Sequence, residues 1–283
     1  MRLSVVIITY NEEANIGRTL QSVQPLVADG KGEIIVVDSG STDRTVEIAK
    51  SLGAKVFVEE WKGFAAQKNS AIDKASGEWI LSLDADEEVE RELTTLIIHV
   101  SQGPAPHPKP ELLEAMGVPV RRIEESHAKT VGYWLHRRNL FMRRWIRHGG
   151  YWPDPKLRLF RRGSGHFEAR AVHEDLKVEG KTGRLLSGAL IHHAYPALSD
   201  YIDHMNHYSS LGAEMVVAKG KVRFSFINIV LRPLFTFIYN YIFRLGFLDE
   251  REGLLLHLYH AVYVSWKYAK AWELSRNKAT LSS

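Results

Sequence analysis

The sequence predicts an α/β fold built on a mostly parallel sheet that is flanked by helices. Two observations support this prediction. Apolar, strand-like runs alternate with helix-like segments throughout the first 84 residues, and polar residues follow these runs at the points where the strands end. Strands joined through helices run parallel by right-handed crossovers, and such sheets bind their ligands beyond the carboxyl ends of the strands.

Four strands are predicted in this region. The first, residues 3–8, is a near-continuous run of β-branched residues, which is typical of a strand buried on both faces. Asn11 is a favourable N-cap for the helix that follows, because its side chain can accept a hydrogen bond from a free backbone N–H group. The remaining strands are predicted over residues 33–38, 54–58 and 78–83, and the helices between them over residues 12–23, 43–52 and 65–75.

The fourth apolar run ends in two carboxylates, Asp84 and Asp86, spaced two residues apart. Carboxylates at this spacing can share one hard divalent cation, which often bridges to substrate phosphates. Such a pair is also common at ordinary solvated strand ends, so the polar residues at 9–12 and 38–41 matter, because they reach the same edge of the sheet. No Gly-x-Gly-x-x-Gly turn or Walker loop follows the first strand, which argues against a dinucleotide-binding or P-loop fold.

Three stretches resemble the signature of family 2 glycosyltransferases, which are inverting enzymes of the GT-A fold that use nucleotide-sugar donors. These stretches are residues 5–13, 35–43 and 83–87. A looser similarity resembles the subgroup that adds glucose or heptose to the inner core of lipopolysaccharide. It covers residues 158–161, 172–174 and 192–196. Together the similarity spans most of the chain except roughly residues 100–130, which include a proline-rich run and are predicted to be a flexible insertion.

The resemblance implies a site for a UDP-sugar at the carboxyl edge of the sheet. It places the uridine against the backbone of Thr9 and Tyr10 and against Glu12 and Asp38, with Asp38 accepting a hydrogen bond from the base. Ser41 is expected close by.

The same resemblance implies a metal ion beside the donor diphosphate. Asp84 and Asp86 would bind Mg²⁺ or Mn²⁺, with His192 as a third ligand to the metal or the diphosphate, and Lys68 would lie near the diphosphate. A divalent cation there neutralises the charge that develops on the leaving nucleotide. A lysine in isolation would otherwise be a solvated surface residue, and a histidine next to another histidine is more often structural.

An inverting transfer also requires a carboxylate that takes the proton of the acceptor hydroxyl. The resemblance implies that Glu174 is this base, and Asp175 is the second candidate because relatives often carry a Glu-Asp pair here. Both residues follow an extended segment, and the competing interpretation is a charged turn without a catalytic role.

The composition restricts the remaining possibilities. The 283 residues are 45% apolar, which suits one sizeable core with an appendage, and there is no cysteine for a disulfide or a thiolate metal site. A strand predicted from residue 3 leaves no room for a signal peptide, so a cytoplasmic enzyme is expected. Several arginines lie near Trp134, Trp145 and Trp152. Without a nucleic-acid-binding module they favour an anionic saccharide or lipid partner, and no nucleic acid is expected.

The C-terminal region, residues 216–283, is predicted to be an amphipathic tail that associates with a membrane. Residues 224–272 hold 13 of the 29 aromatic residues, and helices are predicted over 222–246 and 251–275. Polar and charged residues interrupt both, which favours helices that lie in the membrane interface over helices that cross it. The alternative is a helical layer that packs on the core.

The resemblance implies a GT-A domain over residues 1–215, and together with the aromatic tail it predicts an enzyme at the cytoplasmic face of the inner membrane. The predicted reaction moves a sugar, with a glucose-like sugar favoured, from a UDP-sugar to a lipid-linked saccharide of lipopolysaccharide core or another envelope glycan. Two alternatives are transfer to polyprenyl phosphate, which needs no strong base, and a non-catalytic scaffold that binds nucleotide sugars. The carboxylates Asp84, Asp86 and Glu174 argue against the scaffold.

Overall fold

The computed structural model describes residues 2–102, 129–168, 175–220 and 222–280. The chain divides into two compact units, one formed by Met1–Arg137 and Pro155–His192 and the other by Arg138–Asp154 and His193–Ser283. We call them unit 1 and unit 2. The boundary predicted at residues 215 and 216 is not a boundary between these units, because contacts place a hairpin from the middle of the chain in the same unit as the C-terminal helices.

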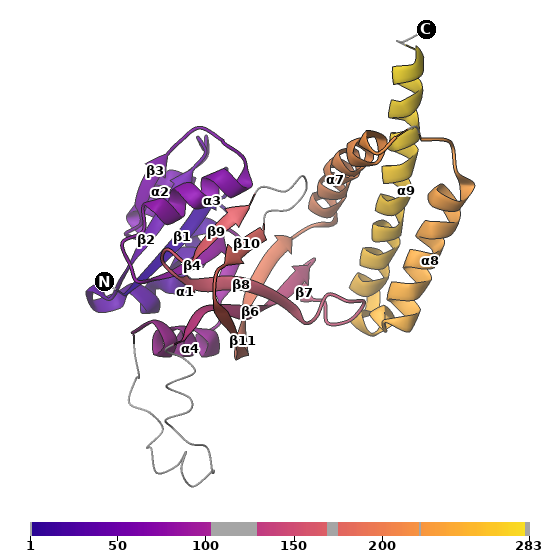
Figure 1. The fold of residues 1–283 in the computed structure, drawn as a ribbon. Coiled ribbons are helices and arrows are strands. Elements are labelled where there is room, and N and C mark those ends of the chain that lie inside the picture. The colour runs from indigo at the N-terminus through magenta and orange to yellow at the C-terminus, as the bar shows by residue number, and fades with distance from the viewer. Residues whose placement is uncertain (1, 103–128, 169–174, 221, 281–283) are drawn as a thin grey trace. The chain divides into compact units, whose positions relative to one another are not determined.

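Unit 1 contains the parallel strands that the sequence predicts (Figure 1). The strands β1 (Leu3–Thr9), β2 (Gly32–Asp38), β3 (Lys55–Val58) and β4 (Trp79–Asp84) lie in the order β3-β2-β1-β4. Neighbouring strands in this order all pair in parallel. The helices between them are α1 (Ile16–Val27), α2 (Thr45–Ser51) and α3 (Phe64–Asp73), with a short 3₁₀ turn η1 (Ala28–Gly30) after α1.

The first helix starts later than the sequence predicts. It begins at Ile16 with Asn15 at the N-cap position, so the prediction that Asn11 caps this helix is wrong. Asn11 has φ 53°, and its side-chain oxygen accepts a hydrogen bond from the backbone of Thr42 in the loop after β2. A contact between two loops therefore replaces the local cap.

Antiparallel strands extend the sheet beyond β4. They are β5 (Glu87–Val89), β6 (Thr130–Phe141), β8 (Asp154–Arg161) and β11 (Lys181–Tyr195), and the full order is β3-β2-β1-β4-β8-β6-β11-β5. β8 runs antiparallel to β4, and β5 pairs antiparallel with β11. A separate hairpin consists of β9 (Gly165–Glu168) and β10 (Asp175–Val178), and α4 (Arg91–Gln102) follows β5.

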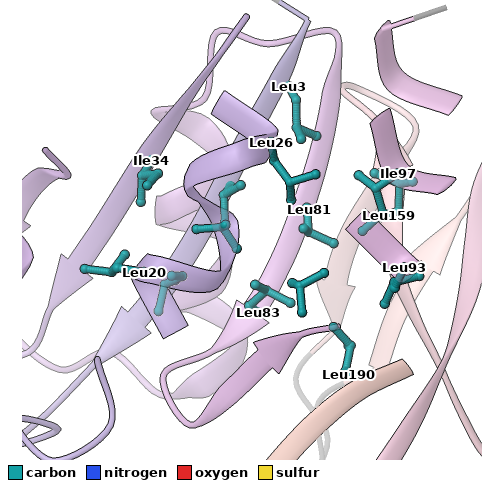
Figure 2. Close-up of a cluster of buried hydrophobic side chains, with 14 of the residues drawn as sticks. Leu3, Leu20, Leu26, Ile34, Leu81, Leu83, Leu93, Ile97, Leu159 and Leu190 are labelled. Atoms are coloured by element: carbon teal, nitrogen blue, oxygen red, sulfur yellow. The ribbon is translucent and has the colours of Figure 1, made fainter. Parts of the chain in front are cut away.

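Helices cover both faces of the unit 1 sheet. One face packs against α1, α2 and α4, where Leu20, Leu26, Leu93 and Ile97 meet strand residues such as Leu81 (Figure 2). The other face packs against α3 and the β9 strand. Because both faces are buried, the parallel strands are apolar at nearly every position, and polar side chains are left to the strand ends.

Unit 2 combines a β-hairpin with helices. The hairpin joins the end of β6 to β7 (Arg144–Trp145). The helical elements are α7 (Leu198–Ala218), η2 (Ile227–Leu231), α8 (Arg232–Ile238), η3 (Tyr239–Phe243), η4 (Gly246–Asp249) and α9 (Glu250–Thr280). Within this unit α9 packs against both α7 and α8 (Figure 1). None of the helices in the described residues is long and apolar enough to cross a membrane.

The predicted helices over residues 222–246 and 251–275 correspond to η2–α8–η3 and to α9, while the sequence analysis did not identify α7. A proline lies early in α8. Pro233 cannot donate the backbone hydrogen bond that would reach Ile229 O in a regular α-helix, and Ser265 Oγ of α9 donates to that oxygen at 2.8 Å. A side chain of the neighbouring helix thus satisfies the carbonyl that the proline leaves free.

Candidate active site

The loops after β1 and β2 are joined by hydrogen bonds between side chains and backbone. The Asn11 N–H donates to Ser41 Oγ at 2.8 Å, and the Thr42 N–H donates to Asn11 Oδ1 at 2.8 Å. The Glu12 N–H donates to Thr45 Oγ1 at 2.7 Å. The positive φ of Asn11 belongs to a region in which asparagine is enriched among non-glycine residues. The two strand ends that were predicted to meet are therefore held together as one structural element.

Asp38, the last residue of β2, fixes the positions of these two loops through hydrogen bonds. Its fully buried carboxylate accepts hydrogen bonds from Thr9 Oγ1 at 2.9 Å, from the N–H groups of Gly40 and Ser41 at 3.0 and 2.8 Å, and from Ser41 Oγ. A carboxylate can accept about four hydrogen bonds, and donors from the chain already supply four to Asp38. Thr9, Asp38 and Ser41 thus lie together as predicted, and the contact of Asp38 with a base stays a prediction.

Tyr10 and Glu12 belong to the same loop but differ in environment. Tyr10 is 58% exposed, which leaves its ring available for stacking. Glu12 is partly buried and accepts a hydrogen bond from Asn15 Nδ2 at 2.9 Å. Burial raises the pKa of Glu12 above its usual value, the Asn15 bond opposes this, and the nearby negative charge of Asp86 adds to the increase. The loop after β1 is therefore within electrostatic reach of the carboxylates after β4.

Asp84, at the end of β4, lies between two buried cations. Lys68 Nζ on α3 is 2.8 Å from Asp84 Oδ1, and the Arg158 guanidinium on β8 contacts Asp84 Oδ2. Burial by itself would raise the pKa of Asp84, but the charges of Arg158 and Lys68 hold it well below the usual range. Asp84 is therefore ionised in the folded chain at neutral pH.

Glu87 and Arg158 are site residues that the sequence analysis did not identify. Glu87 is fully buried, and its Oε1 lies 2.7 Å from Arg158 NH2 and 3.3 Å from Arg137 NH1. Its other oxygen accepts a hydrogen bond from the Asp84 N–H at 3.0 Å. Burial lowers the pKa of Arg158, but Asp84 and Glu87 outweigh burial and raise it. The available signal was a lone arginine within the apolar sequence Leu-Arg-Leu-Phe of β8.

Asp86 forms the second part of the carboxylate pair. His192 Nε2 of β11 lies 3.2 Å from Asp86 Oδ2, and His192 is aligned with Glu87 through the pairing of β11 and β5. Burial raises the pKa of Asp86 and the neighbouring Asp84 adds to this, but His192 lowers it enough that the net direction is downward. The sequence-predicted metal residues Asp86 and His192 are thus direct neighbours.

The side chains fit a divalent cation that is shared with a substrate. Among the residues that the structure describes, no three His, Asp or Glu side chains are grouped to hold a metal ion by themselves. Mg²⁺ and related ions are commonly held by one or two carboxylates together with substrate phosphates. Asp86 and His192 supply one oxygen and one nitrogen side by side, while both oxygens of Asp84 face cations. The role of Asp84 as a metal ligand stays a prediction.

The helix that carries Lys68 also fixes the strand before the candidate base. Asn69 Nδ2 donates to Phe167 O at 2.9 Å, and the Phe167 N–H donates to Asn69 Oδ1 at 2.8 Å. Asp175 opens β10 and pairs in register with Glu168. The predicted base Glu174 lies outside the described residues, and no observation tests the choice between Glu174 and Asp175.

The chain shows similarity to known proteins over most of its length. The profile described as Glycosyl transferase family 2 matches residues 4–165. The lipopolysaccharide core biosynthesis glycosyltransferase LpsC of Rhizobium meliloti is 31% identical over 98% of this chain and 94% of its own length. The chain belongs to glycosyltransferase family 2. It is therefore a nucleotide-sugar glycosyltransferase, and its mixed α/β sheet with flanking helices is of the GT-A type.

Two further similarities were found. An uncharacterised glycosyltransferase of Rickettsia typhi is 30% identical over 97% of this chain and 88% of its own length. A solved structure of mannosyltransferase PcManGT from Pyrobaculum calidifontis, in complex with GDP-Man and Mn²⁺, is 18% identical in sequence. The match covers 99% of this chain and 80% of that chain, with a TM-score of 0.47.

Proposed function

We propose that this family 2 glycosyltransferase transfers a sugar, with a glucose-like sugar favoured, from a UDP-sugar to a lipid-linked saccharide of lipopolysaccharide core or another envelope glycan. The observation that carries the donor side is the cluster after β4, where the carboxylates Asp84 and Asp86 lie beside Lys68, Arg158 and His192. The similarity to LpsC, whose name specifies lipopolysaccharide core biosynthesis, supports the acceptor side.

The proposed reaction breaks the bond between the anomeric carbon and the diphosphate oxygen, and that oxygen keeps the electron pair. The acceptor hydroxyl attacks the opposite face of the anomeric carbon, which inverts the configuration. The developing negative charge lies in a region where Lys68 and Arg158 already carry buried positive charges. Charges fixed in advance in a poorly solvated site stabilise a charged transition state because little reorganisation is needed.

The acceptor hydroxyl must lose its proton as the new bond forms. In the proposal a carboxylate takes this proton, with Glu174 as the first candidate and Asp175 as the second. The Asn69–Phe167 hydrogen bonds hold β9, whose last residue Glu168 pairs with Asp175. These contacts give Asp175 a defined place at the start of β10.

A divalent cation, Mg²⁺ or Mn²⁺, would be held by Asp86 and His192 together with diphosphate oxygens, and it would act as a Lewis acid for the leaving group. Lys68 and Arg158 keep Asp84 ionised without any metal. The structure therefore supports a site whose carboxylates remain charged before a donor arrives.

The hairpin of unit 2 supports an anionic acceptor. The guanidinium groups of Arg138 and Arg147 lie 4.6 and 4.7 Å from the centre of the Trp145 ring, and Trp152 packs edge-to-face on Trp145 at 5.2 Å. Arginine recognises phosphate and carboxylate groups through paired N–H donors, and stacking on an aromatic ring restricts its orientation. Such a pair suits the phosphate or carboxylate groups of a charged saccharide.

A panel of nucleotide sugars tests the donor side. Purified full-length protein should release nucleoside diphosphate from one UDP-sugar in the presence of Mn²⁺ or Mg²⁺ and an acceptor extract. The Asp86→Ala variant should lose this activity while keeping the melting temperature of the wild type. Full activity in excess chelator would contradict the proposed metal. If the enzyme prefers polyprenyl phosphate as acceptor, the proposed saccharide acceptor is wrong.

A further inference from the structure

The helical part of unit 2 leaves many large apolar side chains exposed. Of the twenty-two exposed large hydrophobic residues in the described part of the chain, fifteen fall between Phe224 and Leu258, so the exposure is concentrated in one region. We call these residues the outer helical face. They are Phe224, Phe226, Ile227, Val230, Leu231, Leu234, Phe235, Tyr239, Ile242, Phe243, Leu245, Phe247, Leu248, Leu254 and Leu258.

The same helices have a second side that is satisfied within the unit. Ile229 O accepts the hydrogen bond from Ser265, and Pro233 is buried. Both η2 and α8 contact α9. These helices therefore have a side that packs within the unit as well as an exposed apolar side.

Exposed apolar area on this scale is unusual for a free surface. Single exposed hydrophobic residues are common, but extended apolar patches mark sites of interaction with proteins or membranes. Phe235 and Phe243 are 65% and 72% exposed, so most of the surface of each residue is in contact with solvent. A partner from outside the described chain is needed to cover them.

The segment between Glu214 and Asp249, which holds thirteen of the fifteen residues of the outer helical face, carries charges of one sign. Between Glu214 and Asp249 the sequence contains no acidic residue, but it contains five basic residues: Lys219, Lys221, Arg223, Arg232 and Arg244. The three arginines are exposed. Asp249 itself is buried and accepts hydrogen bonds from the N–H groups of Arg147 and His148. The exposed part of this segment is therefore apolar, aromatic and cationic.

We infer that the outer helical face binds the surface of an anionic lipid bilayer, with the helices in the plane of the interface. Amphipathic helices of this kind insert apolar and aromatic side chains at the level of the headgroups while arginine and lysine attract anionic lipid. A second copy of the chain is the poorer occupant, because a twofold contact places the face against itself and brings like charges together.

Vesicle binding of the full-length protein tests this inference. The protein should co-sediment with phosphatidylcholine vesicles that contain phosphatidylglycerol, less with phosphatidylcholine alone, and less at high salt. Arg223→Gln should weaken binding about fivefold, because one basic residue near such a surface contributes about that factor. Phe235→Ser combined with Phe243→Ser should weaken it by more than about tenfold, since both rings lose apolar burial.

Leu186→Ser is the matched control, because Leu186 is 74% exposed but belongs to unit 1. It should bind vesicles like the wild type. Equal binding by the Phe235/Phe243 double variant, or no binding by the wild type, would overturn the inference. If the wild type does not bind vesicles but forms a dimer, and the double variant is a monomer, the outer helical face is the contact with a second copy of the chain. Asp86→Ala should still bind vesicles, so this inference and the proposed function can fail separately.

Discussion

The end of β4 and the outer helical face differ in which side chains they bury. The first buries charged side chains, and the second exposes apolar ones. Around Asp84 the charges are buried, and each has a partner of opposite sign, as with Lys68, Arg158 and Glu87. On the outer helical face the apolar side chains are exposed, and the charges of the segment between Glu214 and Asp249 are all positive. The first region is complete within the chain except for a substrate, whereas the second requires a surface from outside.

The largest expected effect concerns the predicted catalytic base of the transfer. Glu174→Gln keeps the side-chain volume but removes the ability to accept a proton. We expect kcat to fall by about 10²- to 10⁴-fold, the usual contribution of a general base, with unchanged donor affinity. Initial rates and donor binding measure this effect. Asp175→Asn is the matched variant. If that variant loses the activity and Glu174→Gln retains it, the proton is transferred to Asp175.

The next largest effect is on stability, when an arginine of an ion pair is replaced by methionine in each unit. Arg158→Met leaves Asp84 and Glu87 without a major partner in a buried site, so the free energy of unfolding should fall by about 3–5 kcal/mol. Arg144 in unit 2 pairs with Glu250, whose side chain is 68% exposed. Arg144→Met should therefore cost less than about 1 kcal/mol.

Urea unfolding of both variants measures this difference. A loss of less than about 1 kcal/mol for Arg158→Met would show that the buried pairs are not needed for stability. Arg158→Lys should lie between the wild type and Arg158→Met, because it keeps the charge but loses the simultaneous contact with two carboxylates.

A smaller effect concerns metal binding. The oxygens of Asp84 face the cations Lys68 and Arg158, and Asp86 faces His192, so Mn²⁺ alone competes with these side chains for the carboxylates. UDP supplies negative charge and phosphate ligands. We expect Mn²⁺ to raise the melting temperature only when UDP is present, with a stabilisation of about 2.7 kcal/mol at a ligand concentration of 100 Kd. Thermal scans with Mn²⁺, UDP, both and neither would measure it. Equal stabilisation by Mn²⁺ without UDP would show that the protein forms the site alone.

The smallest effect concerns a buried histidine in unit 2. His257 is 1% exposed, and neither ring nitrogen has a hydrogen-bond partner among the described residues. The ring packs closely on Gly149 and Gly246. Burial, together with the charges of His260 and Arg244, lowers the pKa of His257 to about 4 despite Asp249. A lowered histidine pKa means that the unfolded chain binds the proton more tightly. Stability is therefore lost as pH falls from about 6.5 to about 4.

His257→Leu removes the titrating group and should flatten this pH dependence. Thermal or urea unfolding at neutral and mildly acidic pH measures the slope for the wild type and the variant. A variant with the same slope as the wild type would assign the acid sensitivity to other groups.

The sequence by itself determined the four parallel strands and the position of polar residues after them. Runs such as the one in β1 carry this information locally, because a strand buried on both faces must be apolar at nearly every position. For the same reason Thr9, Asp38 and Asp84 could be assigned to strand ends. The family signature added their expected roles, and the prediction of family 2 membership and of the GT-A fold is confirmed.

Only the tertiary structure decided which groups meet. Arg158 lies 74 positions from Asp84 in the sequence, and Asn11 meets Thr42 across two loops rather than capping its own helix. Local patterns cannot specify such contacts, because the free energy of a buried charge depends on a partner that the fold brings from elsewhere. The same holds for Pro233, whose freed carbonyl acceptor finds Ser265 only because α8 packs on α9. Side-chain type and order are local properties, whereas pairing and exposure are properties of the packed chain.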